Sequence, residues 1–294
     1  MGNLIRAEFR KILTTKMWWA LLIPAVGLAL GWAWLAAKFF TDVGDAIEDA
    51  LNSGGISNAE LSLSSLALTR AMNFASLFPM VFGALALASE LNRKTITTSF
   101  LTAPSRATVL GAKAIVYTMW GLVYGVVVAL AASLGIVLGT TGKLPDASDW
   151  LIILFTGILS CLLWTLLGMG VGALLGSPVA ALLVLLLYAG LIGPIAEVLI
   201  TAQNPDLHLA GVMPNGSANG LTGSTAAQLL YDQIQGIVGG NPTPSERDQF
   251  DVIARAGAGA PGAFSMWISG LIFLAWTAVF FVGGLLRNNN RDIT

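Results

Sequence analysis

Six long apolar runs, almost free of charged residues, constrain the fold of this chain more than any other feature. A bilayer core needs about 20 helical residues per crossing, because every backbone N–H and C=O must be bonded within the segment. We therefore expect an all-α integral membrane protein in which residues 1–294 form a single transmembrane domain. The six spans are predicted at residues 17–37, 71–89, 114–138, 150–175, 179–200 and 265–286.

Composition agrees with this reading. Only 11% of the residues are charged and the mean hydropathy is +0.77, whereas a soluble domain carries about 25% charged residues. Gly176-Ser177-Pro178 separates the fourth and fifth runs and predicts a tight hairpin between them. Pro79 predicts a kink in the second span.

The distribution of charge predicts the orientation. Segments that carry more Lys and Arg remain in the cytoplasm, and with the N-terminus inside, ten of the fifteen basic residues fall there, against three of the sixteen acidic ones. An even number of spans returns the C-terminus to the same side. We expect a multi-pass protein of the cytoplasmic (inner) cell membrane with both termini in the cytoplasm.

The first sixteen residues predict an amphipathic helix. We expect its apolar side to lie in the inner membrane interface and its basic side to contact the anionic headgroups. The alternative is that these basic residues only fix the topology. The residues assigned to this interfacial helix are Ile5, Arg6, Phe9, Arg10, Ile12 and Leu13.

Two segments on the predicted outer side contain signals for helices outside the spans. The acidic loop after the first span contains Ser57-Asn58-Ala59-Glu60, a capping box that predicts an early start of the second helix. Residues 201–264 form an extracytoplasmic segment with two short amphipathic helices, the first capped by Ser224. The second starts at the capping box Thr243-Pro244-Ser245-Glu246 and ends near Gly257.

Catalytic motifs are missing. The sequence has no phosphate-binding G-x-x-x-x-G-K-[ST] motif and no H-E-x-x-H, C-x-x-C or G-x-S-x-G, so we expect no enzyme activity, metal or cofactor in this chain and no nucleic-acid partner. Cys161 is expected to be a buried packing residue. Arg70, Glu90 and Glu197 lie at span ends, where snorkelling to the interface is expected rather than an ion-coupled relay.

Glycine repeats at every fourth position predict close approach between helices. They are Gly27 and Gly31, Gly121 and Gly125, and Gly168, Gly172 and Gly176.

The predicted cytoplasmic loop at residues 90–106 is the most informative segment. A short helix ended by Pro104 would place Ile96, Phe100 and Ala103 on one face beside a basic flank. Such a helix suits docking into a groove on a cytosolic partner, and an ordinary basic loop that fixes topology is the alternative.

At this loop the sequence resembles the type-2 ABC exporter permeases. These proteins have a Glu at the end of the second span, a Lys/Arg-Thr step, a Thr/Leu-rich stretch, a Pro-Ser/Thr-Arg and a Lys in the third span. The matching residues are Glu90, Lys94-Thr95, Phe100-Leu101-Thr102, Pro104-Ser105-Arg106 and Lys113. The six spans, the N-terminal helix and the long segment before the last span extend the resemblance over the whole chain.

The resemblance implies a permease subunit that forms the substrate pathway of an ATP-driven exporter. Its partners would be two separate cytosolic ATPase subunits, which hold the ATP and Mg, and a second copy or a related permease within the membrane lipid. The segment from Arg93 to Arg106 would be the coupling helix, and Glu90 is expected to pair with a nearby basic group. Ile96, Phe100 and Leu101 are the expected apolar plugs of that helix, and the expected polar contacts are Arg93, Lys94 and Arg106. Thr95 and Pro104 are assigned to the same helix.

Two other classes stay open. A membrane-embedded enzyme acting on lipid would need a polar cluster at one membrane face. The candidates are Asp206, His208, Asn215 and Asn219. A non-transporting scaffold or regulatory subunit is the third class. The scarcity of polar residues in the spans favours an amphiphilic or lipid-like cargo for the exporter.

Overall fold

The computed structural model describes residues 2–53, 63–95, 105–141, 144–203, 207–238 and 243–289, and these ranges contain helices and no strand. Six of the described segments are long and apolar enough to cross a membrane, which confirms the predicted all-α fold with six spans. They are Met17–Ser53 (α2), Ser64–Asn92 (α3 and α4), Arg106–Gly139 (α6), Ala147–Leu175 (α7), Pro178–Gln203 (α8 and α9) and Met266–Asn288 (within α13).

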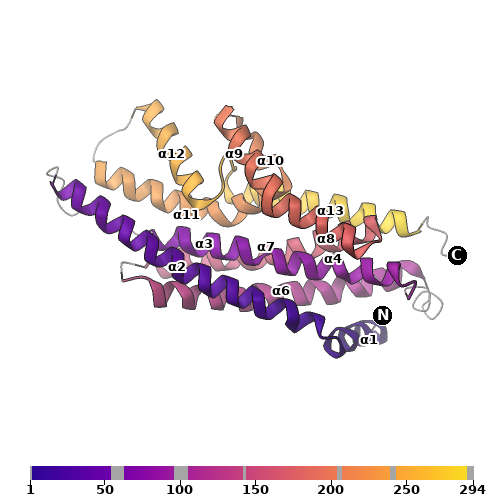
Figure 1. Ribbon diagram of the computed structural model, residues 1–294. Coiled ribbons are helices and arrows are strands. Elements are labelled where there is room, and N and C mark those ends of the chain that lie inside the picture. The colour runs from indigo at the N-terminus through magenta and orange to yellow at the C-terminus, as the bar shows by residue number, and fades with distance from the viewer. Residues whose placement is uncertain are drawn as a thin grey trace.

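The long helices run side by side in one elongated bundle (Figure 1). The N-terminal helix α1, Gly2–Thr14, lies at one end of the bundle, and α12, Pro244–Ala258, lies towards the other. We call these the α1 end and the α12 end. The chain begins and α13 finishes at the α1 end, as an even number of crossings requires.

The first span is longer than its apolar run. Helix α2 has 37 residues, about 55 Å at 1.5 Å per residue, well beyond the ~30 Å of a bilayer core. Its last turns carry Asp42, Asp45, Glu48 and Asp49, which sequence reasoning placed in a loop. The helix therefore continues past the apolar region as a polar extension. The predicted capping box at Ser57 to Glu60 lies outside the described residues.

The second span is interrupted as expected from Pro79. Helix α3, Ser64–Ala75, ends at Ser76, and α4, Leu77–Asn92, begins directly after it. Pro79 has no N–H to donate to the carbonyl of Ala75, four residues earlier. The break is mild, because Ser76 keeps helical backbone angles of −65° and −15°.

The hairpin between α7 and α8 is confirmed. Gly176 ends α7 in the left-handed conformation with φ 66°, which glycine adopts without steric cost. The Ser177 hydroxyl then accepts a hydrogen bond from the N–H of Ala180 and caps α8, Pro178–Leu187. A π-helical turn at Tyr188–Ile192, which the sequence pattern did not predict, leads into α9, Gly193–Gln203.

The first of the two helices predicted in residues 201–264 starts earlier and is longer than predicted. Helix α10, Leu209–Val212, precedes α11, Pro214–Val238, in which Ser224 is an interior residue. The Ser224 hydroxyl donates to the carbonyl oxygens of Gly220 and Phe264, so the prediction that it caps a helix is wrong. The Gly-, Ser- and Asn-rich first half of α11 has low helix propensity, but it packs against α7 and α13 with Ala218 and Leu221 buried.

The capping box of the following helix is confirmed. Thr243 and Glu246 bond each other's backbone at the start of α12. The helix ends at Gly259, with φ 79°, two residues beyond the predicted Gly257.

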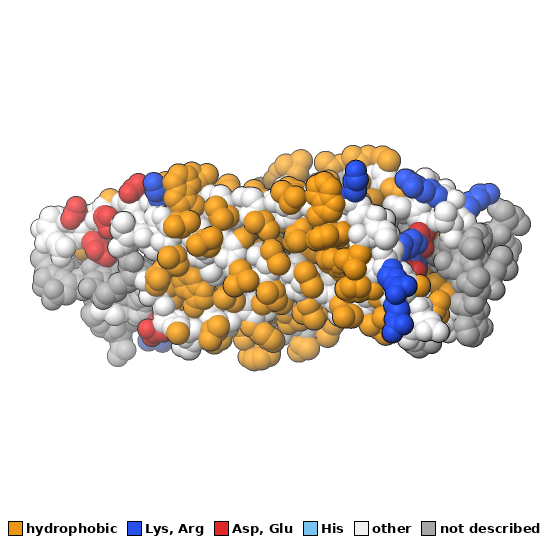
Figure 2. Space-filling view, turned by 90° about the horizontal axis from the view of Figure 1, so that it is seen from below, with side chains coloured by type: hydrophobic (Ala, Val, Ile, Leu, Met, Phe, Trp, Pro, Cys, Tyr) orange, Lys and Arg blue, Asp and Glu red, His pale blue; other side chains and the backbone are white. Residues whose placement is uncertain are grey.

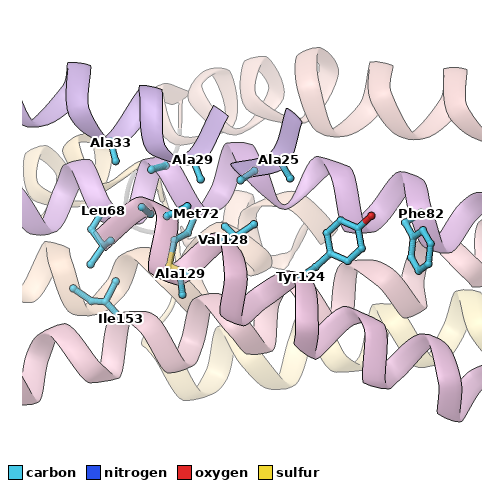
Figure 3. Packing of buried hydrophobic residues seen from close by; sticks show 14 of the residues in the cluster. Ala25, Ala29, Ala33, Leu68, Met72, Phe82, Tyr124, Val128, Ala129 and Ile153 are labelled. Carbon is cyan, nitrogen blue, oxygen red and sulfur yellow. The ribbon is translucent and has the colours of Figure 1, made fainter. Parts of the chain in front are cut away.

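Small residues set the helix spacing in the core, which is centred on α7 with α4, α6 and α13 around it. A Cβ built at Gly168 or Gly172 would overlap the carbonyl oxygens of Met80 and Ala84 on α4, so the predicted close approach is confirmed there. On α2 the alanines carry the contact with α6 (Figure 3), and Ala25, Ala29 and Ala33 are fully buried. Gly121 and Gly125 on α6 also lie directly against α7. A Cβ built at Gly27 or Gly31 meets no described atom within 4 Å, so these two glycines make no close contact within this chain, and a contact with a second copy stays a prediction.

Candidate functional site

Four charged side chains from three helices meet at the α1 end. Lys113 on the second turn of α6 donates from Nζ to Oε2 of Glu8 at 2.6 Å and to Oε1 of Glu90 at 2.7 Å. Lys11, one turn after Glu8 on α1, donates to the same Oε1 of Glu90. We call Glu8, Lys11, Glu90 and Lys113 the Lys113 cluster. It joins α1, the last turn of α4 and the first turns of α6.

Three members of the cluster are buried, Lys11 is 46% exposed, and the charges balance. Lys113 is 0% exposed and both glutamates are buried, while two lysines offset two carboxylates. An ion in such an environment is costly unless it is paired. The expectation that Glu90 pairs with a basic group is confirmed, and the expectation that it snorkels to the interface is wrong. Oε2 of Glu90 has no hydrogen-bond partner among the described residues.

Aromatic packing fixes α1 beside the cluster. The Phe9 ring centroid lies 5.9 Å from that of Trp120 on α6, and the Trp18 ring centroid lies 5.4 Å from that of Trp120. The Tyr124 hydroxyl donates to the backbone oxygen of Trp18 at 2.6 Å. The start of α2 is thereby attached to α6 as well.

The predicted apolar face of α1 is thus partly used inside the protein. Ile12 is buried and Ile5 packs against the core, as Phe9 does, whereas Leu13 is 48% exposed. Arg6 and Arg10 are exposed on the opposite face. The exposed surface of α1 therefore consists of its basic face and a narrow apolar edge.

The end of α4 is a sharp, well-defined stop. The N–H of Thr95 donates to the carbonyl of Glu90, and the N–H of Lys94 donates to the carbonyl of Leu91. This pair of bonds is the Schellman motif, which places Lys94 in the left-handed region with φ 56°. Arg93, Lys94 and Thr95 therefore form the turn that ends α4, rather than the first turn of a coupling helix.

The chain is described again from Ser105, whose hydroxyl accepts from the N–H of Thr108 and caps α6. Arg106 is the first residue of α6 and donates to the backbone oxygen of Asn288 in α13. Both ends of the predicted docking loop are therefore fixed at the α1 end. The other members of the predicted site, Ile96, Phe100, Leu101 and Pro104, lie outside the described residues.

An open cavity of about 470 Å³ lies between α1, α2, α4 and α6 at this end. Glu90, Arg93 and Thr95 contribute to its wall from α4 and its turn, and Lys11 and Lys16 from the N-terminal region. Figure 2 shows Lys and Arg side chains gathered at one end of a broad apolar band, with Asp and Glu predominating at the other. The α1 end thus combines a basic surface with a recess beside the docking loop.

Two further ionisable residues were expected to snorkel, and one of them, Glu197, is buried instead. Glu197 on α9 is 1% exposed, and its oxygens accept from the side-chain amides of Asn215 and Asn219 at 2.7 and 3.2 Å. Arg70 on α3 donates to the backbone oxygens of Ala256 and Gly257. Hydropathy alone missed the burial of Glu197, because an average over a span does not report the direction in which one side chain points.

The polar residues that were candidates for a lipid-modifying site do not contact one common group. Asn215 and Asn219 are bonded to Glu197, whereas the His208 ring lies 5.4 Å from that of Phe264; Asp206 lies outside the described residues. Cys161 is fully buried, as expected. Within the described ranges no group of three or more His, Cys, Asp and Glu residues is arranged to hold a metal ion.

Comparisons with known proteins identify no relative: no family model matches the chain, and no curated protein is similar to it.

Proposed function

We propose that this chain is the membrane-spanning permease subunit of an ATP-driven exporter, of the type-2 ABC class that its sequence resembles. The Lys113 cluster carries the proposal, because it ties the helices on both sides of residues 96–104 to α1, through the buried pairs of Lys113 and the partly exposed pair of Lys11 with Glu90. A force applied to that loop acts on α1, α4 and α6 together.

The chain has no phosphate-binding motif of its own, so the motor is a pair of separate cytosolic ATPase subunits that bind ATP and Mg. The α1 end then faces the cytoplasm, with both termini, and α11 and α12 face the outside. Closure of the ATPase pair moves the α1 ends of the helices as one body. This movement switches the substrate pathway from inward-facing to outward-facing. Such a switch is biased because ATP stabilises one of its two states.

A second permease copy, or a related permease, completes the pathway. In the spans α2, α8–α9 and α13 only 22% of the most apolar window is buried in the single chain. These faces contact membrane lipid or the second permease.

Co-purification with an ATPase subunit encoded beside this chain tests the proposal. Phe100→Asp is expected to abolish assembly without loss of membrane insertion, since a charge at an apolar plug is not accepted by a protein groove. Ile253→Asp is the matched control, an exposed apolar residue on α12 at the opposite end, and it is expected to keep assembly. Assembly of Phe100→Asp at the wild-type level would contradict the docking site, and a complete absence of an ATPase partner would favour a lipid-modifying enzyme or a scaffold.

Orientation is tested separately by labelling. Cys161 is fully buried, so the wild-type chain is expected not to react with a membrane-impermeant maleimide. Asn3→Cys and Ser245→Cys place a thiol at exposed positions of the α1 and α12 ends. In intact cells only the Ser245 variant is expected to react, and the reverse pattern would overturn the proposed orientation.

A further inference from the structure

A second polar site lies at the α12 end of the bundle, far from the Lys113 cluster. It is a cavity of about 270 Å³ between α3, α9 and α12. Three polar side chains line it, namely Arg70, Glu197 and Thr201, and the rest of its wall is apolar or glycine. We call it the Arg70 cavity.

Arg70 is held in place with donors to spare. Nη2 donates to the backbone oxygen of Ala256 at 2.9 Å and Nε to that of Gly257 at 3.4 Å. Gly259, with φ 79°, lies directly against the guanidinium, where any Cβ would overlap it. Among the described residues Arg70 has no carboxylate within ion-pair distance. A guanidinium carries five N–H donors, so this cation can still bind an anion.

Glu197 is oriented by neutral donors. The amides of Asn215 and Asn219 each bond one carboxylate oxygen, and each oxygen has a second lone pair free. Both asparagines are on α11, so the carboxylate is fixed relative to the bundle. It therefore faces the cavity as a preorganised acceptor for a cationic group.

Thr201, one helical turn after Glu197, supplies an independent observation. Its side chain is only 8% exposed and lines the same cavity, yet Oγ1 has no hydrogen-bond partner among the described residues. An unpaired buried hydroxyl costs free energy. Oγ1 lies against Gly262, and a change of the χ1 rotamer of Thr201 would turn it towards a polar ligand in the cavity. Neither Arg70 nor Glu197 forms a hydrogen bond with the Thr201 hydroxyl.

An apolar groove of about 480 Å³ adjoins the other side of Arg70. It lies between α2 and α3, and its wall includes Trp32, Leu35, Phe39 and Phe74. The Trp32 and Phe74 rings meet edge to face, with 4.7 Å between their centroids. Arg70 therefore stands between a charged cavity and a surface suited to an acyl chain.

We propose that these two recesses together bind a zwitterionic amphiphile, a lipid whose head group carries a phosphate and a primary ammonium. The phosphate lies against Arg70, the ammonium donates to Glu197 and Thr201, and an acyl chain occupies the aromatic groove. A primary ammonium fits better than a trimethylammonium, because it can donate hydrogen bonds to the carboxylate. A purely anionic lipid would bring its charge close to Glu197 without a compensating group.

Competitive lipid retention measures this binding in the full-length chain without any ATPase, so the result does not depend on the proposed export role. The protein in detergent is offered an equal mixture of phosphatidylethanolamine, phosphatidylcholine and phosphatidylglycerol with identical acyl chains, and bound lipid is counted by native mass spectrometry. We expect phosphatidylethanolamine to be retained about tenfold over the other two, the difference made by one charge-assisted hydrogen bond. Equal retention of all three, or preference for phosphatidylglycerol, would overturn the proposal.

Variants assign the contacts. Arg70→Gln is expected to lower phosphatidylethanolamine retention about tenfold, and Glu197→Gln is expected to remove the preference over phosphatidylglycerol. Thr201→Val keeps the shape of the side chain and provides a second variant that leaves the fold intact; it is expected to weaken retention of phosphatidylethanolamine. Arg247→Gln, an exposed change on α12, is the control and leaves retention unchanged.

The groove is tested by its own variant and probe. Phe39→Ala is expected to lower retention of all three lipids alike, because it removes acyl-chain contact only. Soluble glycerophosphoethanolamine, which has the head group without the chains, is expected not to displace bound lipid. Displacement by this probe, or unchanged retention in Phe39→Ala, would overturn the assignment of the groove.

Discussion

The Nζ atom of Lys113 lies 2.6 Å from Oε2 of Glu8, although 105 residues separate them in the chain. This contact attaches a short N-terminal helix to the third span inside the protein, where an unpaired charge is costly. Four predictions follow from this and other contacts.

Lys113→Met is expected to destabilise the protein by about 3–5 kcal/mol, the usual result of removing one partner of a buried ion pair. The midpoint of thermal unfolding in detergent measures the loss. Lys16→Met, an exposed lysine at the same end, is the control and is expected to change the midpoint little. The double variant Glu8→Gln with Lys113→Met is expected to lose less than the sum of the single variants; strict additivity would show that the two residues are not coupled.

Lys94→Gly is expected to stabilise α4 by about 1 kcal/mol, because a non-glycine residue in the left-handed conformation is strained. Arg93→Gly, one residue earlier and at negative φ, is the matched change and is expected to be neutral or destabilising. Thermal unfolding of the two variants side by side measures the difference. A higher midpoint for Arg93→Gly than for Lys94→Gly would contradict the assigned turn.

Gly168→Val and Gly172→Val are expected to prevent correct packing of α4 on α7, since the added side chain meets backbone atoms that cannot move independently. Gly27→Val and Gly31→Val meet open space and are expected to leave the folded monomer intact. Size-exclusion profiles of fluorescently tagged variants in detergent distinguish folded from aggregated protein. A normal profile for Gly172→Val would show that α4 and α7 are not in close contact.

The start of α12 is expected to weaken in acid. Hydrogen bonds from the hydroxyl and the backbone N–H of Thr243 hold the pKa of Glu246 below its ordinary value of 4.5. A depressed carboxyl pKa contributes stability above the unfolded-state value, and the contribution is lost as pH falls through the folded-state value. Amide exchange protection at the first turn of α12 is therefore expected to differ between wild type and Glu246→Gln at pH 7, and the difference is expected to vanish below the depressed pKa. A difference that persists unchanged in strong acid would contradict the capping role.

The spans, the hairpin and the α12 cap could be predicted from sequence because each has a local cause. Gly176 ends a helix by its own backbone freedom, and Pro79 removes a hydrogen bond wherever it stands. The prediction at Ser224 was wrong because it considered only the local sequence. Ser224 has the chemistry of a helix cap, but the packing of α11 against α7 and α13 stabilises a helix that continues on both sides of it.

The charged sites could be predicted only in part. Glu90 and Lys113 were noticed as motif residues, but the role of Glu8 depends on how α1 folds back onto α6, which no local pattern records. Glu197 and Arg70 stand at span ends, and sequence position cannot separate a side chain that reaches water from one that faces α11 or α12. Asn215 and Asn219 would have been the signal, since amides four residues apart on one helix face suit a buried carboxylate.

The π-helical turn at Tyr188–Ile192 acts as a one-residue insertion in the fifth span. One residue corresponds to a rotation of about 100° around a helix axis, so the turn sets α9 on a different azimuth from α8. The two halves of the span therefore contact different neighbours: α8 packs against α4, and α9 contacts α11. Were the turn to relax to regular α-helix by loss of Gly190, seven residues before Glu197, the carboxylate would rotate away from its asparagines, so deletion of one uncharged residue would disassemble the buried carboxylate site.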